Sequence, residues 1–318
     1  MPTMSTRASV ASALSQAGSV GMSGEVLAAQ LGVSRVAVSR HVATLRELGY
    51  SIGSAPRAGY RLHTAPDSCI PEEVAPLLRH PLWVGCEGAA SMPSTSDEAK
   101  RRARSGAPGG TVVVAGRQTG GRGRFGRTWE SPGAGVYASV VLRPEITPAD
   151  ASPLPLVVAL GAAVALEGIG VEAGLKWPND IVAGERKLGG ILLEMAAEAD
   201  STEWVVAGIG VNVSDPGHDR AAWVREQVPD VRVPVVAAAL LDGMASAYAE
   251  FCRSGFAALR EGYERRMTLK GEAVTVKDLA GSIVAEGLVV GIDPGGALVV
   301  EGGAGLVAVH GGDVTLRA

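Results

Sequence analysis

The stretch GGRGRFGRTWESP, residues 120–132, places three arginines and four glycines ahead of a tryptophan and a Ser-Pro pair. It lies between two β-branched runs, TVVVAG (111–116) and GVYASVVLRP (135–144), which are typical of buried strands. A glycine-rich loop after a strand leaves backbone N–H groups free to approach an anion, and guanidinium groups neutralise its charge. The stretch therefore predicts an anion-binding loop on a sheet, and a mobile, solvated arginine loop is the alternative.

Neither standard nucleotide motif fits this loop. It lacks the Gly-Lys-Ser/Thr ending of a P-loop. Gly121, Gly123 and Gly126 match the GxGxxG spacing, but no acidic residue follows a second strand about 20 residues later, as a dinucleotide site requires. The loop on its own leaves the kind of anion open.

The surrounding chain reads as three segments. Around the loop, β-branched runs, including STEWVVAGIGVNVS (201–214), alternate with Ala/Leu-rich helical stretches at 151–168 and 234–266, which predicts an α/β segment. From Gly271 onward, short strands separated by glycine turns predict a small barrel-like all-β domain. The polar, proline-bearing TAPDSCIPEEVAPL (64–77) predicts a linker with a short helix. We expect domains at 1–64, 65–268 and 269–318.

Residues 8–50 have the spacing of a helix-turn-helix. Apolar residues recur at helical intervals, Gly32-Val33-Ser34 supplies a turn and an N-cap serine, and small Ala28 lies where the helices must approach. Residues 51–62 predict a hairpin, which makes the motif winged. A helical protein-interaction module is the alternative, but Arg46 and the other arginines favour DNA. The residues expected to contact DNA are Ser34, Arg35, Val36, Ser39, Arg40 and Arg57.

Composition limits the class of protein. The chain has 318 residues, 47% of them hydrophobic, and a formal net charge of −4, which argues against a protein coated with nucleic acid. Three cysteines show no metal-ligand spacing and no disulfide framework, so we expect a reduced, cytoplasmic setting and no metal ligands. No stretch suggests the roughly 20 apolar residues of a membrane span.

A second cluster, LKWPNDIVAGERKLGGILLE (175–194), holds a lysine on a rigid corner. Trp-Pro restricts the backbone after Lys176, and Asn179-Asp180 favours a turn. A lysine near a strand end is usually a surface residue. The rigid residues after Lys176 instead suggest a fixed positive charge for an oxyanion or phosphoryl group.

Two further clusters are less specific. GIGVNVSD (208–215) ends a buried strand in alternating glycines and Asn212, which suits close packing against a ligand or reflects the glycine-rich composition. SMPSTSDEAKRRA (91–103) places Ser94, Thr95 and Ser96 ahead of a helix, as caps or as partners of a neutral polar ligand. No Ser-His-Asp or Cys-His arrangement emerges, so the chemistry indicated is transfer of an activated group without a covalent enzyme intermediate.

Together and in this order, GRGRFGRTWESP, KWPNDI, RKLGGILLE, GIGVN and the C-terminal HGGDVTL resemble the biotin protein ligases of the bifunctional type that also repress transcription. The resemblance covers nearly the whole chain. It implies a winged helix-turn-helix, a central mixed-sheet domain like class II synthetases and an SH3-like C-terminal domain. It also implies ATP and Mg²⁺, biotinoyl-5'-adenylate as intermediate, transfer to a lysine of a biotin carboxyl carrier protein, operator DNA as a partner, and a homodimer once adenylate is bound.

The resemblance assigns roles to residues of this sequence. Lys176, Arg124 and Arg127 would be catalytic, with Lys176 stabilising charge as the mixed anhydride forms. The implied nucleotide contacts are Arg124, Arg127, Lys176, Asn179, Asn212 and Trp223. The implied biotin contacts are Ser94, Thr95, Ser96, Gln118, Gly121, Arg122, Gly123, Arg124, Trp129, Lys176, Lys187, Gly208 and Gly210.

This sequence departs from the family at Phe125, where another basic residue is common, and we expect an altered loop contact there rather than lost activity. Two other functions remain open: a ligand-sensing transcription factor without catalysis, and a lipoate ligase or related acyl transferase. The complete arginine loop and Lys176 argue against the first, and the winged helix and intact GRGRFGRTW argue against the second.

Overall fold

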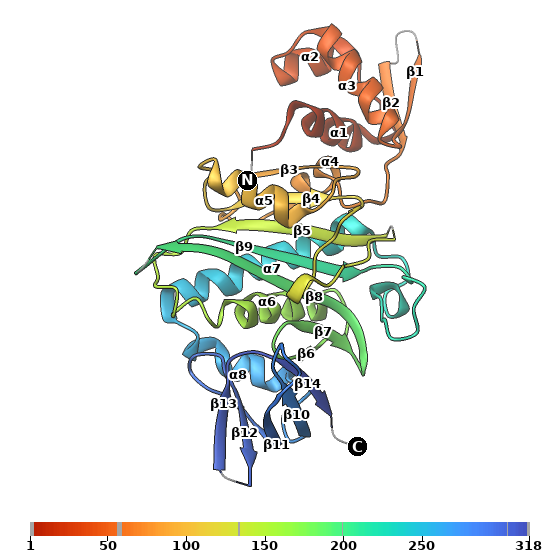
Figure 1. Cartoon of the computed structure of the whole chain (residues 1–318). Coiled ribbons are helices and arrows are strands. Elements are labelled where there is room, and N and C mark those ends of the chain that lie inside the picture. The colour runs from red at the N-terminus through yellow and green to blue at the C-terminus, as the bar shows by residue number, and fades with distance from the viewer. Residues whose placement is uncertain (1–2, 56–58, 133, 199, 304, 317–318) are drawn as a thin grey trace.

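The computed structural model describes residues 3–55, 59–132, 134–198, 200–303 and 305–316. A helical N-terminal part lies at one end, a large sheet in the middle and a small sheet at the other end (Figure 1). The central elements are mixed α/β and the last five strands are antiparallel, which confirms the expected fold class.

The N-terminal part is a helix-turn-helix followed by a hairpin, as expected. Its elements are α1 (Thr6–Ala17), η1 (Gly18–Val20), α2 (Gly24–Leu31), α3 (Arg35–Glu47), β1 (Ser51–Ala55) and β2 (Gly59–Thr64). Ser34 caps α3 by accepting a hydrogen bond from the Ala37 N–H, and Gly32 ends α2 in the left-handed region. The wing tip with Arg57 lies outside the described residues.

A short linker joins this part to the central sheet through α4 (Pro71–Val74) and η2 (Ala75–Leu77). Ile70 belongs to the N-terminal hydrophobic core, and the nearly buried Glu72 pairs with Arg7 at 2.6 Å. Tyr50 donates a hydrogen bond to Glu73 at 2.6 Å. The winged helix is therefore tied to the linker by polar contacts as well as by packing.

The central part is a seven-stranded mixed sheet with strand order β3-β4-β5-β9-β8-β7-β6, in which only the β3-β4 pair is parallel. Its elements are β3 (Gly85–Ala89), α5 (Thr95–Arg104), β4 (Thr111–Ala115), η3 (Arg124–Gly126), β5 (Gly135–Leu142), α6 (Leu154–Gly168), β6 (Gly174–Lys176), β7 (Asp180–Ala183), β8 (Arg186–Glu198), β9 (Ser201–Asn212), η4 (Val224–Glu226), α7 (Val233–Ser254) and α8 (Ala257–Arg266).

Both faces of the sheet are covered at β4, which explains its unbroken β-branched sequence. Successive side chains point to opposite faces, so Val112 and Val114 join the core on the α6 and α7 side while Val113 packs in the cluster with α5. Helices α6 and α7 lie against one face of the sheet (Figure 1).

The expectation that no stretch is a membrane span is tested at α7. This 22-residue helix is the one described helix that is long and apolar enough to span a membrane. More than half of its most apolar window, 56%, is buried inside the protein, where it packs against α6. A Cβ atom on Gly161 would meet the backbone of Gly243, so the two glycines allow this close approach. In this structure α7 is a core helix.

The C-terminal part is a five-stranded antiparallel sheet, ordered β13-β12-β11-β10-β14. Its strands are β10 (Ala273–Lys277), β11 (Ile283–Ile292), β12 (Leu298–Gly302), β13 (Gly305–Val309) and β14 (Asp313–Leu316). Its inner residues, such as Val276 and Leu298, share one continuous hydrophobic core with the central sheet. That packing fixes β14 beside the central domain.

Candidate active site

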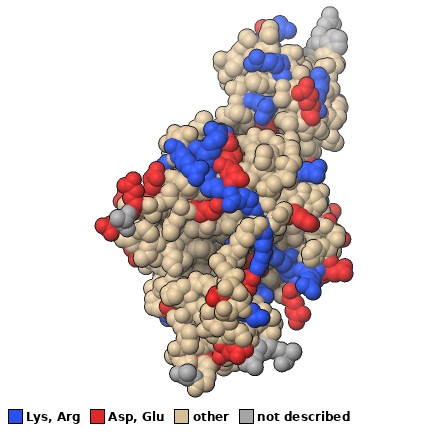
Figure 2. All heavy atoms as spheres, in the orientation of Figure 1, with Lys and Arg blue, Asp and Glu red and all other residues tan. Residues whose placement is uncertain are grey.

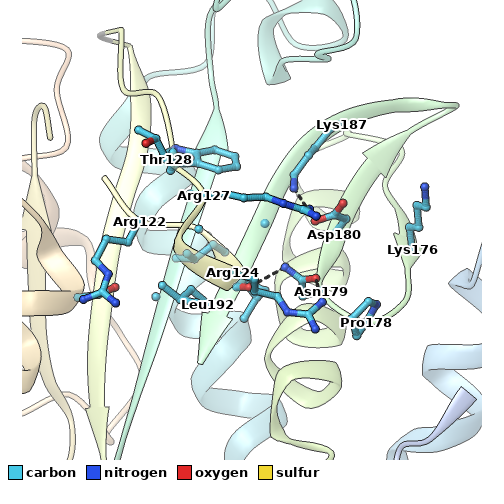
Figure 3. Close-up of a pocket in the computed structure, with 18 of the residues that line it drawn as sticks. Arg122, Arg124, Arg127, Thr128, Lys176, Pro178, Asn179, Asp180, Lys187 and Leu192 are labelled. Atoms are coloured by element: carbon cyan, nitrogen blue, oxygen red, sulfur yellow. Dashed lines mark hydrogen bonds and ion pairs between the residues drawn. The ribbon is translucent and has the colours of Figure 1, made fainter. Parts of the chain in front are cut away.

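A cavity of about 330 Å³ opens where the sheet meets the arginine-rich loop (Figure 3). Its walls come from the start of α5, the loop, the β6–β7 turn, β8, β9 and the beginning of β14. Residues that lie far apart in the sequence therefore form one site. The following residues expected from the sequence line it: Thr95, Ser96, Gln118, Arg122, Gly123, Arg124, Arg127, Trp129, Lys176, Asn179, Lys187, Gly208 and Gly210.

One end of the cavity is neutral and polar. Gln118 Oε1 accepts hydrogen bonds from the Thr95 N–H at 2.7 Å and from the Thr95 hydroxyl at 3.1 Å. Ser139 lies behind them, 2.9 Å from Thr95 Oγ1 and 3.1 Å from Ser96 Oγ. Such groups hydrogen-bond an uncharged polar ligand, and they position it without adding charge.

The middle of the cavity is an indole wall. A Cβ atom on Gly210 would lie 2.6 Å from Trp129 Cε2, so only glycine leaves room for the ring. A Cβ atom on Gly208 would lie 2.7 Å from Ser96 Oγ. Both glycines are therefore required by close packing, and the composition bias of the chain does not explain them.

The far end is cationic. Lys187 Nζ pairs with Asp180 Oδ1 at 2.6 Å and lies 5.6 Å from the centre of the Trp129 ring. Lys176 ends β6, and in the described part of the chain its ammonium group has no hydrogen-bond or ion-pair partner. In Figure 3 its side chain lies apart from the Arg124 and Asn179 pair. Two lysines thus offer charge at two different places.

The turn after Lys176 is held from several sides. Asn179 donates to the Ile191 carbonyl at 2.9 Å and accepts from Arg124 at 2.8 Å. Trp177 donates its indole N–H at 3.0 Å to the carbonyl of Gly296, in the turn between β11 and β12. The expected rigid corner is therefore present.

Each arginine of the loop is attached to a different element. Arg122 pairs with Asp97 at 2.6 Å and with Glu194 at 3.3 Å. Arg124 contacts Asn179, and Arg127 pairs with Asp313 on β14. Burial lowers the pKa of Arg124, although the group stays charged near neutral pH. In this arrangement the side chain of Arg122 points toward acidic residues on α5 and β8.

Phe125, which departs from the family pattern, has φ of 57°, in the left-handed region that favours glycine. The Arg124 guanidinium lies 4.5 Å from the centre of its ring, and the side chain is 46% exposed. The aromatic ring therefore covers one face of Arg124, which is an interaction that a second basic residue would not make.

Some expected residues lie outside the lining of the cavity. Ser94 caps α5 by accepting from the Asp97 N–H at 3.3 Å, and Gly121 packs against the Trp129 backbone. Asn212 is buried and donates to the Ala222 carbonyl at 3.1 Å. The guanidinium group of Arg186 lies over the Trp223 ring, 5.8 Å from its centre. Their roles toward a ligand stay predictions.

Several lining or supporting residues were missed by the sequence reasoning. Asp180 stands next to a named residue of KWPND and could have been included. Ser139 is the one serine or threonine in β5, whose eight residues are all buried, and such an isolated hydroxyl was a usable signal. Asp313 stands in the HGGDVTL motif, but the motif did not reveal its partner Arg127, which lies 186 positions away.

The expected DNA-binding residues of α3 share one exposed surface. Ser34, Arg35, Val36, Ser39 and Arg40 are all exposed, while Val38 and Val42 face the core. Arg46, which was counted toward DNA, instead donates to the Ile52 carbonyl at 2.8 Å. Figure 2 shows Lys and Arg side chains on this part of the protein and in a band across the central part.

The chain was compared with known proteins. Residues 88–212 match the biotin/lipoate A/B protein ligase family, residues 7–61 an HTH domain, and residues 270–317 the biotin protein ligase C terminal domain. The chain is 32% identical to the bifunctional ligase/repressor BirA of Bacillus subtilis, over 95% of this chain and 96% of that protein. It is 31% identical to the Escherichia coli protein of the same description, over 93% of each.

Among solved structures, the fold is similar to the biotin protein ligase from Aquifex aeolicus in complex with biotin and ATP. The TM-score is 0.63 at 29% identity, and the match covers 73% of this chain and 98% of that one.

Proposed function

This chain belongs to the family of bifunctional biotin protein ligases and repressors, and from this premise we propose how its parts perform the two activities. The enzyme uses biotin and ATP. A biotin carboxylate oxygen attacks the α-phosphorus of ATP, the bond to pyrophosphate breaks, and biotinoyl-5'-adenylate forms. A lysine amine of the acceptor protein then attacks the activated carbonyl carbon, loses a proton, and displaces AMP.

The observation that carries the proposal is the order of chemistry along the cavity. A neutral hydrogen-bonding end at Gln118 and Thr95 leads past the Trp129 wall to a cationic end at Lys187 and Arg124. Biotin has the same order, with a cyclic urea at one end, an apolar ring and chain, and a carboxylate at the other. We place the urea among the hydroxyls and the carboxylate beside the cations.

The cationic groups act on charge that develops as the anhydride forms. The carboxylate is a weak nucleophile toward a polyanionic triphosphate, and fixed cations reduce the repulsion and stabilise the transition state. Lys187 lies beside the indole wall, so we assign it to the carboxylate and α-phosphate, together with Arg124. Lys176, which has no ion-pair partner among the described residues, shares this task and reaches the outer phosphates.

A magnesium ion fits the same end. Mg²⁺ in nucleotide sites is held by one or two carboxylates together with phosphate oxygens, and Asp180 provides a carboxylate in the cavity. When bound, the ion neutralises phosphate charge and polarises the phosphoryl oxygens. Asp180 would hold the ion, and the ammonium group of Lys187, which pairs with Asp180 at 2.6 Å in this structure, would then be available to the substrate.

The adenylate hydrolyses in water, so the site has to exclude solvent once the intermediate has formed. The glycine-rich loop can do this, because its arginines are held by exchangeable partners, Asp97 and Asp313, both about half exposed. We propose that phosphate replaces Asp313 as the partner of Arg127 and draws the loop over the nucleotide.

The first step is tested by release of pyrophosphate from ATP and Mg²⁺, with biotin or lipoate supplied in parallel. Release that depends on biotin is the expected result. Release with lipoate alone would favour the lipoate-ligase reading, and no release with either would favour the non-catalytic sensor. The hydroxyl-lined end favours biotin, because the dithiolane ring of lipoate has no hydrogen-bonding group to match it.

DNA binding by the exposed surface of α3 accounts for the repressor activity. We propose that the adenylate-bound protein dimerises and presents two such helices to a palindromic operator, one helical turn apart. A gel shift whose affinity is unchanged by biotin and ATP would contradict this coupling.

We further propose domain boundaries at 1–64, 65–268 and 269–318, the last domain contacting the carrier protein beside the cavity. We place the protein in the cytoplasm, where its three free thiols stay reduced.

A further inference from the structure

Ser139 lies directly behind the neutral end of the cavity. It comes from the middle of β5, it has no exposed surface, and it does not line the cavity itself. Its hydroxyl lies between two hydroxyls that do line the cavity, 2.9 Å from Thr95 Oγ1 and 3.1 Å from Ser96 Oγ. It can therefore reach a ligand only through those two residues.

The orientation of the Gln118 amide is fixed by a backbone group. The Thr95 N–H donates to this amide at 2.7 Å, and an N–H group requires an acceptor, so the atom facing it must be the amide oxygen. The Nε2 group of Gln118 then points elsewhere, toward the loop at Gly121, where a Cβ atom would meet it at 3.1 Å. This amide nitrogen stays available as a donor.

The hydroxyl protons can now be assigned one after another. Gln118 Oε1 carries no proton, so the Thr95 hydroxyl, 3.1 Å away, must donate to it. Thr95 has no second proton, so Ser139 is the donor in the contact between them. Ser139 is then also committed, and Ser96 must donate to Ser139. All three protons point away from the ligand, toward Gln118.

We propose that Ser139 is a positioning residue that makes Thr95 and Ser96 hydrogen-bond acceptors and so selects a ligand with N–H donors at this end. The inference rests on the proposed function: in biotin the selected groups are the N–H groups of the cyclic urea. The carbonyl oxygen of the urea must then find its donors elsewhere, at Gln118 Nε2 and backbone N–H groups of the loop.

The packing around Ser139 agrees with a dense hydroxyl cluster. A Cβ atom on Gly208 would lie 2.7 Å from Ser96 Oγ and 3.3 Å from Ser139 Oγ. An alanine at 208 would therefore push the two hydroxyls apart, and glycine on β9 gives them room. The cluster thus joins three elements, α5, β5 and β9, at one point below the ligand.

The test compares biotin with its two lactam analogues, in each of which one urea N–H is replaced by CH₂, on wild type and Ser139→Ala. In the wild type, replacing a urea N–H by CH₂ should weaken binding at least tenfold, because a buried hydroxyl acceptor, on Thr95 or Ser96, loses its donor. In Ser139→Ala, the Ser96 proton is released and the Thr95 hydroxyl keeps only its bond to Gln118, so biotin binding weakens about tenfold and the discrimination against the lactams falls to about threefold or less. The KM for ATP and kcat at saturating biotin should change less than about twofold.

Two further variants keep the experiment decisive. Ser139→Cys retains a weak donor of similar size and should recover part of the discrimination, also if the alanine variant is poorly folded. Thr202→Val removes another buried hydroxyl, on β9, which bonds to no described group, and it should leave the ratio unchanged.

Equal discrimination in the wild type and in both Ser139 variants would overturn the inference, even if biotin binds more weakly to the variants. Absence of biotin binding by the wild type would instead overturn the proposed function on which the inference rests.

Discussion

At the scale of single residues, Gly210 is a position in the cavity where the structure leaves no room for a side chain. The Trp129 indole occupies the space of its missing side chain, with Cε2 at 2.6 Å and Nε1 at 2.8 Å from an ideal Cβ atom. We expect Gly210→Ala to displace the ring and raise the KM for biotin at least tenfold, on the order of 1.4 kcal/mol of lost binding, with a much smaller effect on the KM for ATP. Steady-state kinetics for both substrates measure this.

Gly303→Ala is the matched control, because a Cβ atom there would meet no other atom within 4 Å. Equal KM values for biotin in Gly210→Ala and the wild type would show that Trp129 does not form the biotin wall.

The two lysines of the cavity should differ in effect. Lys187 is placed by Asp180 and lies beside Trp129, whereas Lys176 has no partner among the described residues. We expect Lys187→Ala to slow adenylate formation by about 100-fold or more, as loss of a fixed transition-state charge does. Lys176→Ala should act mainly through the KM for ATP. Single-turnover formation of the adenylate separates the two effects.

Lys270→Ala controls for loss of a lysine outside the cavity, because its ammonium group pairs with Glu264 at 2.6 Å and does not line the cavity. Full single-turnover activity in both Lys187→Ala and Lys176→Ala would remove the assigned electrostatic mechanism.

Which residues the sequence could predict depends on how local their signal is. Arg124, Gln118 and Trp129 stand in or beside one distinctive stretch, so their convergence on the cavity was predictable from the resemblance. Ser139 is recognisable only when β5 is known to be buried on both faces. Asp313 stands in the recognised HGGDVTL motif, but its pairing with Arg127 joins residues 186 positions apart, and no local pattern carries that information.

At the scale of elements, the arginine-rich loop connects three parts of the molecule. Arg122 is tied to α5 and β8, Arg124 to the β6–β7 turn, and Arg127 to Asp313 at the start of β14. The loop is therefore ordered in the absence of phosphate by carboxylates and an amide. The C-terminal sheet takes part directly in holding it.

Removing one of these contacts should make the arginine-rich loop more mobile. We expect Asp313→Asn to increase the rate of limited proteolysis within residues 120–132 in the ligand-free protein, because Arg127 loses its ion pair. Biotin with ATP and Mg²⁺ should restore protection in the wild type and in the variant. Asp278→Asn, also on the C-terminal part, is the control, and the same cleavage rate with and without ligands would contradict closure of the loop.

The stability that the ion pairs at the start of α5 contribute should depend on pH. Burial alone would raise the pKa of the Asp97 carboxyl, but hydrogen bonds and charge attraction from Lys100 and Arg122 outweigh it and hold the pKa below its usual value. A lowered pKa in the folded state contributes stability above the unfolded value, near 3.9, and this stability is lost as the pH falls through the folded value.

Asp97→Asn removes this contribution, so the free energy of unfolding of the variant should fall less than that of the wild type between about pH 5 and pH 3. Urea unfolding across this range measures it, with Asp219→Asn, a change at an exposed position, as control. Parallel curves for the Asp97→Asn variant and the wild type would show that the ion pairs contribute nothing.

The elements themselves were predictable to different degrees. Helical periodicity and capping signals located α1 to α3, and the β-branched runs located β4, β5 and β9. Helix α7 resembles a membrane span by length and composition alone, since a helix buried in a protein core can be as apolar as a lipid-facing one. Strand order was not predictable, because pairing such as β5 with β9 depends on contacts about 70 residues apart in the chain.

At the scale of the whole molecule, the winged helix and the enzyme form one connected structure. The linker residues Glu72 and Glu73 hold the N-terminal part through Arg7 and Tyr50, and they lie next to the central sheet. A change in the catalytic domain therefore has a physical route to the DNA-binding helix.

DNA binding should depend on the exposed arginines of α3. For a 40-base-pair duplex, we expect Arg35→Ala with Arg40→Ala to reduce the slope of log affinity against log salt by roughly one to two, since each cation bound near phosphate releases counterions. Fluorescence anisotropy at several salt concentrations gives the slope. Arg265→Ala, in the exposed ion pair with Glu261 on α8, serves as the control, and an unchanged slope in the double variant would place the DNA surface elsewhere.

The account as a whole claims that one cavity activates biotin and that the activated group is passed to a protein lysine. The most direct test incubates the full chain with biotin, ATP, Mg²⁺ and a biotin carboxyl carrier domain, followed by an avidin blot and the intact mass of the carrier. We predict one biotinoyl group on one lysine, dependent on ATP and strongly reduced by Lys187→Ala. An unmodified carrier, or equal labelling by the wild type and the Lys187→Ala variant, would contradict the central claim.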